Sequence, residues 1–404
     1  MSSIPDIPMH EESYWQDPYP VLRELRANHR VARNDQGHIA LLHWDDAVSG
    51  MKGNDFGAEG IEVLERRGFA PGDPMHTWRK NAIGVMEGAR HRRVRSLAAS
   101  ALSKSRMEEL RPLIRKHAHS LIDRVVEARE VDALDAFARP LPRRVMMEFL
   151  GVSPDEMLSS QREVARVPIV DCFGPNVTPE LRSAANEAIQ HSMDHVAELY
   201  EKRRSDPRDD LLTHLAAAKD EHGTLSEGEL VTLFSTIFGS GASTTSILAS
   251  GLLELTRHPE AAALLRSDPG RWMRGASEET LRFRPSITAV GLKATDAIEA
   301  FGVKFDREQP ISVILGSANR DAAYWEEPER FDIQRDPKKT SLTFGIGAHV
   351  CLGHAMARAT VEEGLAAFVA RCDELSLLNE PRWIPFVMEN KLDALRIGFS
   401  PTPG

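Results

Sequence analysis

The chain has 404 residues, of which 42% are hydrophobic and 27% are charged, as is usual for a soluble globular protein with a sizeable core. Its net charge is −10 and it has no long Lys/Arg block, which argues against nucleic acid as a partner because phosphate binding draws on concentrated positive charge. No apolar run approaches the ~18 residues of a membrane span, and residues 1–10 lack a signal-peptide pattern, so we expect a cytoplasmic protein outside the membrane.

The first predicted elements in chain order are a short strand and three helical segments. Strand-forming residues occupy 39–43. His91 and Arg95 have i, i+4 spacing, which places both side chains on one face of a helix. Apolar residues at helical spacing predict two longer helices, over 110–125 and 181–204.

The most informative helix is predicted from Ser226 to about Arg257. Ser226 and Glu229 have the spacing of a capping box, which begins a helix, and Pro259 ends it. Residues 239–246 read Gly-Ser-Gly-Ala-Ser-Thr-Thr-Ser, which is poor helix-forming sequence. We therefore expect a long buried helix that opens or kinks near its centre.

The last third of the chain adds few strands and one clear helix. Glu279 and Arg282 lie on a short predicted helix that Pro285 ends, and alone they would form a surface ion pair worth a few tenths of a kcal/mol. Strands are predicted at 311–315 and 395–399, and a helix over 354–371. Strands and helices do not alternate and no linker is visible, so we expect one mainly α domain spanning residues 1–404, with a small β portion.

The loop around Cys351 carries the chemistry. The other cysteines, Cys172 and Cys372, lie too far away for a disulfide framework, so we expect reduced thiols. Residues 344–353 read Phe-Gly-Ile-Gly-Ala-His-Val-Cys-Leu-Gly, and the predicted helix follows at once. Cys351 therefore precedes a helix N-terminus, where unpaired N–H groups and the helix dipole stabilise a thiolate. The glycines let the loop turn tightly and lie flat against a large ligand.

Three other interpretations of this loop do not fit. A dinucleotide-binding loop needs a third glycine, where Val350 stands. Covalent c-type haem needs Cys-x-x-Cys-His, which the chain lacks. A zinc site from His349, Cys351 and His354 would lack a fourth ligand and would crowd three ligands onto six residues.

The loop resembles the Phe-Gly-x-Gly-x-His-x-Cys-x-Gly signature of the cytochrome P450 family at every fixed position. The resemblance extends from about Asp17 to Ile397, and Asp17-Pro-Tyr-Pro20 is similar to soluble bacterial members. Glu279-x-x-Arg282 also matches, as do the segments 319–321 and 328–332. The resemblance implies the P450 fold, a large helical domain with a small β-rich portion, and a non-covalent haem b buried between central and proximal helices.

The resemblance further implies which residues hold the haem. Cys351 would be the iron ligand, and a thiolate pushes electron density onto iron. A cationic pair suits two carboxylates, so His91 and Arg95 would bind the haem propionates, and His349 would face one of them. Glu279 and Arg282 would form a buried network that shapes the proximal side. The remaining cofactor-binding residues would be Phe344, Gly345 and Gly241.

Two positions depart from the family pattern. Gly241-Ala-Ser-Thr-Thr245 stands at the oxygen-binding segment, where Thr244 occupies the usual alcohol position and Ser243 replaces the usual acid; both are predicted catalytic residues. Leu292 stands where bacterial members often carry an arginine for a propionate. Lys293 is adjacent to it, but neighbouring residues on a strand face opposite ways.

The activity that the resemblance implies is a monooxygenase that places one oxygen atom of O2 in a small apolar organic substrate. The chain has no flavin or iron–sulfur signature, so electrons would come from NAD(P)H through a separate ferredoxin and ferredoxin reductase. Two alternatives stay open. Ser243 leaves room for another haem–thiolate outcome, such as peroxide-driven oxidation or oxidative coupling. The other alternative is a haem-binding sensor without turnover. The alcohol that Thr244 keeps at its usual position argues against it.

The family also indicates where substrate and electron donor would bind. Four regions would line the substrate pocket: 69–90, 167–177, 286–290 and 386–388. Their apolar candidates are Trp78, Met86, Phe173, Ile287 and Phe386, for which simple core packing is the alternative. The electron donor would dock near Cys351 on a cationic surface formed by Arg92, Arg93, Lys104 and Arg106.

Overall fold

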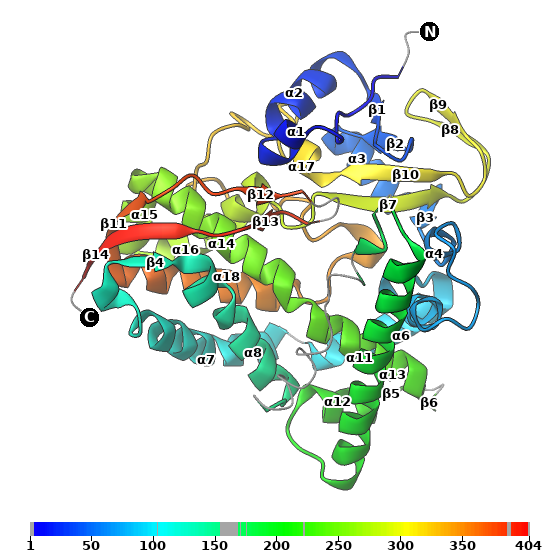
Figure 1. The fold of residues 1–404 in the computed structure, drawn as a ribbon, viewed down its shortest axis with the longest axis horizontal. Helices are drawn as coiled ribbons and strands as arrows, with labels where there is room; N and C mark the ends of the chain where they lie inside the picture. The colour runs from blue at the N-terminus through cyan, green and yellow to red at the C-terminus, as the bar shows by residue number, and fades with distance from the viewer. Residues whose placement is uncertain are drawn as a thin grey trace. The chain divides into compact units, whose positions relative to one another are not determined.

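The computed structural model describes residues 4–102, 104–153, 169, 171–174, 176–220, 223–385 and 389–402 (Figure 1). Contacts within the chain define two compact units. The first unit comprises Met1–Gly57, Met107–Val145 and Ala242–Gly404, and the second comprises Ala58–Arg106 and Met146–Gly241. The single domain over residues 1–404 remains a prediction.

Three long helices form the centre of the first unit: α14 (Gly241–Arg257), α16 (Pro269–Phe283) and α18 (His354–Arg371). Glycines permit their close approach. A Cβ at Gly251 of α14 would lie 2.9 Å from Leu365 of α18, and one at Gly364 would lie 3.0 Å from Leu248. The other helical elements of this unit are α1 (Glu12–Gln16), α2 (Tyr19–Asn28), α3 (Trp44–Lys52), η2 (Val126–Ala128), a π-helical turn η3 (Leu134–Ala138), α15 (Pro259–Ser267), α17 (Leu315–Ala318) and η4 (Gly347–His349). Two more helices are divided between the units: α7 (Lys104–Ile122) belongs to the first unit from Met107 onward, and α8 (Pro140–Leu150) as far as Val145.

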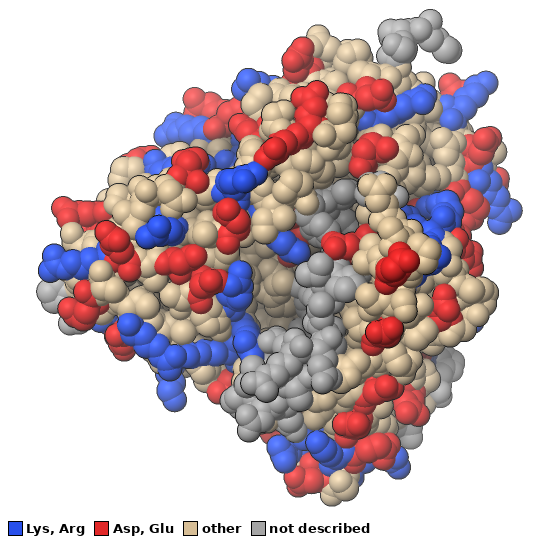
Figure 2. Space-filling model, viewed as in Figure 1, with Lys and Arg blue, Asp and Glu red and all other residues tan. Residues whose placement is uncertain are grey.

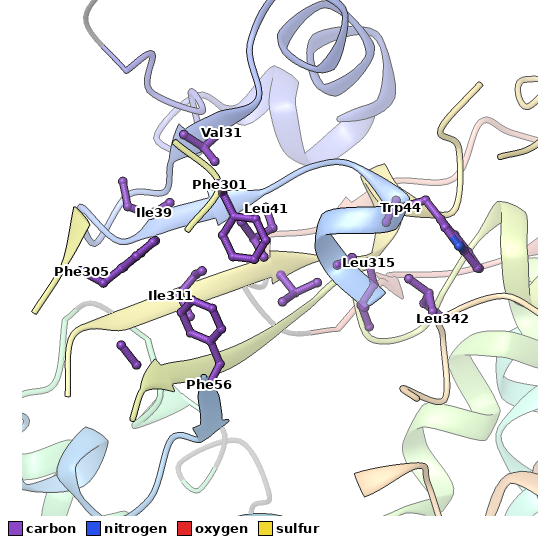
Figure 3. Packing of buried hydrophobic residues seen from close by; sticks show 14 of the residues in the cluster. Val31, Ile39, Leu41, Trp44, Phe56, Phe301, Phe305, Ile311, Leu315 and Leu342 are labelled. Carbon is purple, nitrogen blue, oxygen red and sulfur yellow. The ribbon is translucent and has the colours of Figure 1, made fainter. Parts of the chain in front are cut away.

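The first unit also contains a five-stranded sheet, of which only Ala58 belongs to the second unit. Its order is β1 (Val31–Arg33), β2 (Ile39–Leu41), β10 (Pro310–Ile314), β7 (Ala289–Ala294) and β3 (Phe56–Ala58). Strand β10 runs parallel to β2 and antiparallel to β7. Figure 3 shows the core on this sheet, where the rings of Phe56, Phe301 and Phe305 meet the aliphatic side chains of Leu41 and Ile311.

The other strands form small sheets. One has the order β11 (Cys372–Leu377), β14 (Arg396–Pro401) and β4 (Glu130–Asp132). Two further pairs in the first unit are β8 (Ile298–Ala300) with β9 (Val303–Phe305), and β12 (Trp383–Ile384) with β13 (Lys391–Leu392).

The second unit is also mainly helical. Its elements are α4 (Glu62–Glu65), α5 (Pro74–Asn81), η1 (Ile83–Val85), α6 (Gly88–Ala101), α11 (Pro179–Ser205), α12 (Leu211–Ala217), α13 (Glu227–Gly239) and the pair β5 (Lys219–Asp220) with β6 (Gly223–Thr224). Ser226 and Glu229 form the predicted capping box at the start of α13. A buried cluster around Leu64, Phe69 and Met75 forms the core.

The predicted helices are largely confirmed. The segments 181–204 and 354–371 lie in α11 and α18. The segment predicted over 110–125 lies in α7 only as far as Ile122, where that helix ends. The helix predicted over 226–257 is two helices, α13 and α14, separated at Ser240. The Ser240 amide and hydroxyl both donate to the Ile237 carbonyl, at 3.1 and 2.7 Å, so a tighter turn replaces the α-helical bond between two glycines.

Two sequence expectations were wrong in extent. The helix with Glu279 is not short, because α16 has 15 residues and starts at Pro269. The three predicted strands are present, but the structure has many more. Most of the others have two or three residues, which is too short for a periodic pattern, and they form only because distant segments pair with them.

Candidate functional site

The cysteine loop is a tight backbone turn immediately before α18. Gly345 and Gly347 have φ values of +71° and +80°, in the left-handed region that favours glycine. A Cβ at Gly347 would also lie 3.2 Å from the Met51 carbonyl oxygen of α3. The Cys351 amide donates to the Phe344 carbonyl at 2.9 Å, which closes the loop. Cys351 stands two residues before the N-cap of α18, as predicted.

Four apolar residues of the loop that holds the exposed Cys351 thiol are only partly buried. They are Phe344, Ile346, Val350 and Leu352, whereas residues 341–343 immediately before the loop are buried. Apolar surface that is left partly exposed in one loop is suited to a ligand. A large, flat, apolar prosthetic group such as haem fits this surface.

Cys351 differs from the other two cysteines. It is exposed, whereas Cys172 and Cys372 are buried, and burial raises the pKa of each of their thiols to about 12. Within the described ranges, no group of three His, Cys, Asp or Glu side chains could hold a metal ion.

The predicted catalytic hydroxyls lie in the first turn of α14. Ser243 and Thr244 are both partly buried, and neither hydroxyl has a hydrogen-bond partner in the part of the chain that the structure describes. In contrast, the Ser246 hydroxyl bonds back to the Ala242 carbonyl at 3.4 Å. A Cβ at Gly241 would meet no atom within 4 Å, so packing does not require glycine there. The two hydroxyls are thus available to a ligand.

The predicted propionate ligands are divided between the two units. His91 and Arg95 lie on one face of α6 in the second unit, where His91 is buried and Arg95 is partly buried. His349 ends η4 in the first unit and is partly buried. The helical spacing of His91 and Arg95 is confirmed, and their joint binding with His349 stays a prediction.

Glu279 and Arg282 form the buried network that the sequence predicts. Both are at most 3% exposed, and the guanidinium makes two hydrogen bonds of 2.8 Å to the carboxylate. Arg282 also donates to three backbone carbonyls, and Glu279 accepts from Arg335 and from the Asp332 amide. Every charged group in the network is therefore hydrogen-bonded.

Asn319 extends this network to the cysteine loop, which the sequence analysis missed. Its carbonyl accepts from Arg282 at 3.1 Å, its side-chain amide donates to the Thr343 hydroxyl at 3.1 Å, and its side-chain oxygen accepts from the Leu342 amide at 2.8 Å. Leu342 and Thr343 immediately precede Phe344. The only sequence signal was the family match of segment 319–321.

The structure shows what Leu292 and Lys293 contact at the position without the usual arginine. Leu292 packs against the core of the five-stranded sheet. The Lys293 ammonium lies 2.5 Å from a Glu308 carboxylate oxygen, and the two groups form an ion pair.

The candidate substrate-pocket residues are seen in core packing. Trp78 and Phe173 pack against the buried cluster of the second unit, and Met86 is buried. Ile287 packs against the core of the five-stranded sheet. Phe386 lies outside the described residues. The four pocket regions therefore stay predictions.

The predicted cationic docking surface is smaller than expected. Arg93 pairs with Glu229 at 3.3 Å and Arg106 pairs with Asp209 at 3.1 Å, so neither is an uncompensated charge. Arg92 is exposed and has no acidic partner among the residues described, and the Lys104 side chain is not described. The sequence could not reveal these pairs because their acids are more than a hundred residues away. Acidic and basic side chains are intermixed over the face in Figure 2.

Comparisons with known proteins agree with the fold. The cytochrome P450 family model matches residues 152–382, more than half of the chain. Cytochrome P450 107B1 from Saccharopolyspora erythraea is 30% identical over 98% of both chains. Polyketide biosynthesis cytochrome P450 PksS from Bacillus subtilis is 31% identical over 97% of this chain and 98% of its own. The solved structure of cytochrome P450 CYP109Q5 from Chondromyces apiculatus has a TM-score of 0.88 at 26% identity and covers all of both chains.

The fold and these relatives define the class of protein, an oxidoreductase of the monooxygenase type. The chain belongs to the cytochrome P450 family. Membership implies the use of haem and O2. No described helix is both long and apolar enough to span a membrane.

Proposed function

We propose that this P450 holds haem through the Cys351 thiolate and oxidises a small apolar organic substrate, with electrons from a separate ferredoxin and its NAD(P)H-dependent reductase. The observation that carries the proposal is the exposed Cys351 thiol on a closed glycine loop that also holds four partly buried apolar side chains, at the N-terminus of α18. When bound, the haem supplies the O2 chemistry that no amino-acid side chain can perform.

The residues of this chain would bind, orient and move protons. The helix dipole and the N–H groups at the start of α18 favour the thiolate form of Cys351. The cations of His91 and Arg95, together with His349, would hold carboxylates by charge-assisted hydrogen bonds. The Thr244 hydroxyl would pass a proton toward the reacting oxygen, and Ser243 would hold a water beside it because a hydroxyl both donates and accepts.

The substrate class is proposed to be apolar, since the pocket regions contribute mainly apolar and aromatic side chains. The relative PksS is named for polyketide biosynthesis, so apolar compounds of that class belong with terpenoids, fatty acids, aromatics and steroids in a first set of test compounds.

Substrate binding and turnover test the proposal together. Haem-loaded protein is titrated with each compound while its spin state is followed by absorbance, and binding compounds are then incubated with ferredoxin, reductase and NADH. We expect at least one compound to shift the spin state and yield an oxygenated product. Turnover with hydrogen peroxide but none with ferredoxin and NADH would favour the peroxide-driven alternative. A complete lack of substrate-dependent electron uptake would favour the sensor.

A further inference from the structure

Arg358, in the second turn of α18, makes three different contacts with one guanidinium group. Its Nε donates to the Glu278 carboxylate of α16, and its Nη1 lies 2.9 Å from Nδ1 of His354, which accepts this hydrogen bond. Its guanidinium carbon lies 4.5 Å from the centroid of the Phe344 ring. The Arg358 side chain is 20% exposed and that of Glu278 is 6% exposed, so water screens these contacts only in part.

Two of the three contacted residues form hydrogen bonds with the backbone of Cys351. The Phe344 carbonyl accepts from the Cys351 amide at 2.9 Å, and the His354 amide donates to the Cys351 carbonyl at 3.4 Å. The third residue, Glu278, immediately precedes Glu279 of the buried Glu279–Arg282 network. Arg358 therefore connects both ends of the cysteine loop to α16.

We propose that Arg358 is a positioning residue for Cys351: it fixes the two loop residues that hold the cysteine backbone, and it keeps a positive charge beside the loop. The geometry suits arginine in particular, because a planar guanidinium can stack on an aromatic ring while its edge donates to a carboxylate and to an imidazole nitrogen. The proposal rests on the proposed function, since it requires Cys351 to be the haem ligand.

The charges around Arg358 determine the direction of the effect. Glu278 acts electrostatically on Glu362 of α18, whose pKa is raised first by burial and further by this nearby carboxylate, against the hydrogen bond from Arg111. Loss of the Arg358 charge would leave the Glu278 carboxylate uncompensated and make the surroundings of the loop more negative. Negative charge opposes the addition of an electron, so the reduction potential of bound haem should fall.

Four variants and the wild type test this inference in the haem-loaded protein. Arg358→Gln removes the charge, Arg358→Lys keeps it without the planar group, and Arg358→Gln combined with Glu278→Gln restores neutrality. Arg371→Gln is the matched control, because Arg371 ends the same helix and pairs with Asp123. The readouts are the midpoint potential, the fraction of the ferrous–CO complex with the thiolate-type Soret band, and kcat and KM for ferredoxin.

We expect Arg358→Gln to lower the equilibrium constant for one-electron reduction about tenfold, which corresponds to a midpoint potential lower by about 59 mV. The double variant should recover most of that shift. Arg358→Lys should keep the potential but lose part of the thiolate-type band. Turnover in Arg358→Gln should fall through kcat with KM for ferredoxin unchanged, whereas a docking contact would raise KM. If Arg358→Gln does not fold, the potentials and Soret bands of Arg358→Lys and of the double variant still test the inference.

Two results would overturn the inference. One is that every Arg358 variant has the same midpoint potential and the same fraction of thiolate-type Soret band as Arg371→Gln. The other is that the Arg358 variants change only the KM for ferredoxin. A wild type without the thiolate-type band would instead refute the haem ligation by Cys351, and with it the proposed function. The two failures are therefore distinguishable in a single experiment.

Discussion

At the scale of single residues, we propose that Ser243 and Thr244 occupy the proton-handling position. Thr244 would supply the alcohol, and Ser243 would stand where the family pattern usually has an acid. A serine hydroxyl can relay a hydrogen bond but cannot act as a near-neutral acid, because its pKa lies far from the working pH. Protons must therefore arrive through water, another residue or a polar group of the substrate, and the efficiency of O2 use should depend on the substrate.

Substitution of these two residues tests that argument. Thr244→Ala should increase the hydrogen peroxide released per NADH consumed, because it removes the remaining hydroxyl relay. Ser243→Asp should decrease the release if proton supply limits coupling, and should increase it if the native substrate itself delivers the proton. NADH consumption, peroxide and product are measured for all three proteins. Equal coupling in all three would remove Ser243 and Thr244 from the proton path.

Asp321 provides a second prediction, on stability and pH. Burial by itself would raise the pKa of Asp321, but hydrogen bonds from His43 and from the amides of Trp44 and Ala323 lower it to about 2. A carboxyl with a lowered pKa stabilises the fold above its unfolded value of about 4, and this contribution is lost as pH falls from about 4 toward 2. At neutral pH it amounts to about 2 kcal/mol.

Asp321→Asn should therefore unfold with a free energy lower by about 2 kcal/mol at pH 7, and the difference from wild type should shrink as pH falls below about 4. Urea unfolding at several pH values measures both quantities. Asp46→Asn is the control, because Asp46 pairs with a largely exposed Arg30 and should contribute little. A difference that does not change with pH would show that Asp321 acts by packing alone.

Local sequence identified some residues of the site and could not identify others. Cys351, Gly345 and Gly347 lie in one ten-residue pattern, and the conformation that it demands is local. Arg358 and Asn319 act through contacts with distant segments: Arg358 contacts Phe344 and Glu278, and Asn319 contacts Arg282. No spacing rule within a helix or strand predicts such contacts, so only the folded chain reveals them.

At the scale of secondary-structure elements, the buried pair on α16 organises the approach to the cysteine loop. Glu279→Ala leaves the Arg282 charge buried without its carboxylate, which typically costs about 3–5 kcal/mol. We expect little folded, haem-loaded protein from this variant. Purified yield and haem content are the measurements.

The chain offers a matched control for this prediction. Glu327 and Arg330 also form an i, i+3 pair, but their side chains are 66% and 59% exposed. Glu327→Ala should therefore have almost no effect on yield or haem content. Equal yields from Glu279→Ala, Glu327→Ala and wild type would mean that the buried pair contributes no more than a surface bridge.

The elements themselves show where sequence patterns suffice. The capping box at Ser226 and the start of α18 at His354 follow from residues within one turn, and both were predicted. The pattern predicted an opening or kink within residues 239–246, and the interruption at Ser240 lies in that segment. The residue at which it occurs depends on which carbonyl the local amides reach. Strand β14 pairs with β4, more than 260 residues away, and β4 alone has no strand pattern.

At the scale of the whole molecule, net charge governs the encounter with an electron donor. The chain carries a charge of −10, and ferredoxins are generally acidic too, so local positive charge must overcome overall repulsion. Arg92 is the predicted docking cation that the structure leaves exposed and without an acidic partner among the described residues. Steering by such charge weakens as salt screens it.

Reduction by ferredoxin should slow as ionic strength rises, and Arg92→Glu should slow it further at low salt. Stopped-flow measurement of the reduction rate provides the test. Arg307→Glu, which changes an exposed arginine in the loop between β9 and β10, is the control for net charge. A rate that ignores both salt and Arg92→Glu would eliminate α6 as a docking element.

The most direct test of the account is the absorption spectrum of the ferrous–CO complex in three cysteine variants. Wild type, Cys172→Ser and Cys372→Ser should all show the red-shifted Soret band of thiolate ligation, because Cys172 and Cys372 are both buried. Cys351→Ser should lose that band even if it retains haem. A Cys351→Ser protein that keeps the red-shifted band would contradict the assignment of Cys351 as the haem ligand.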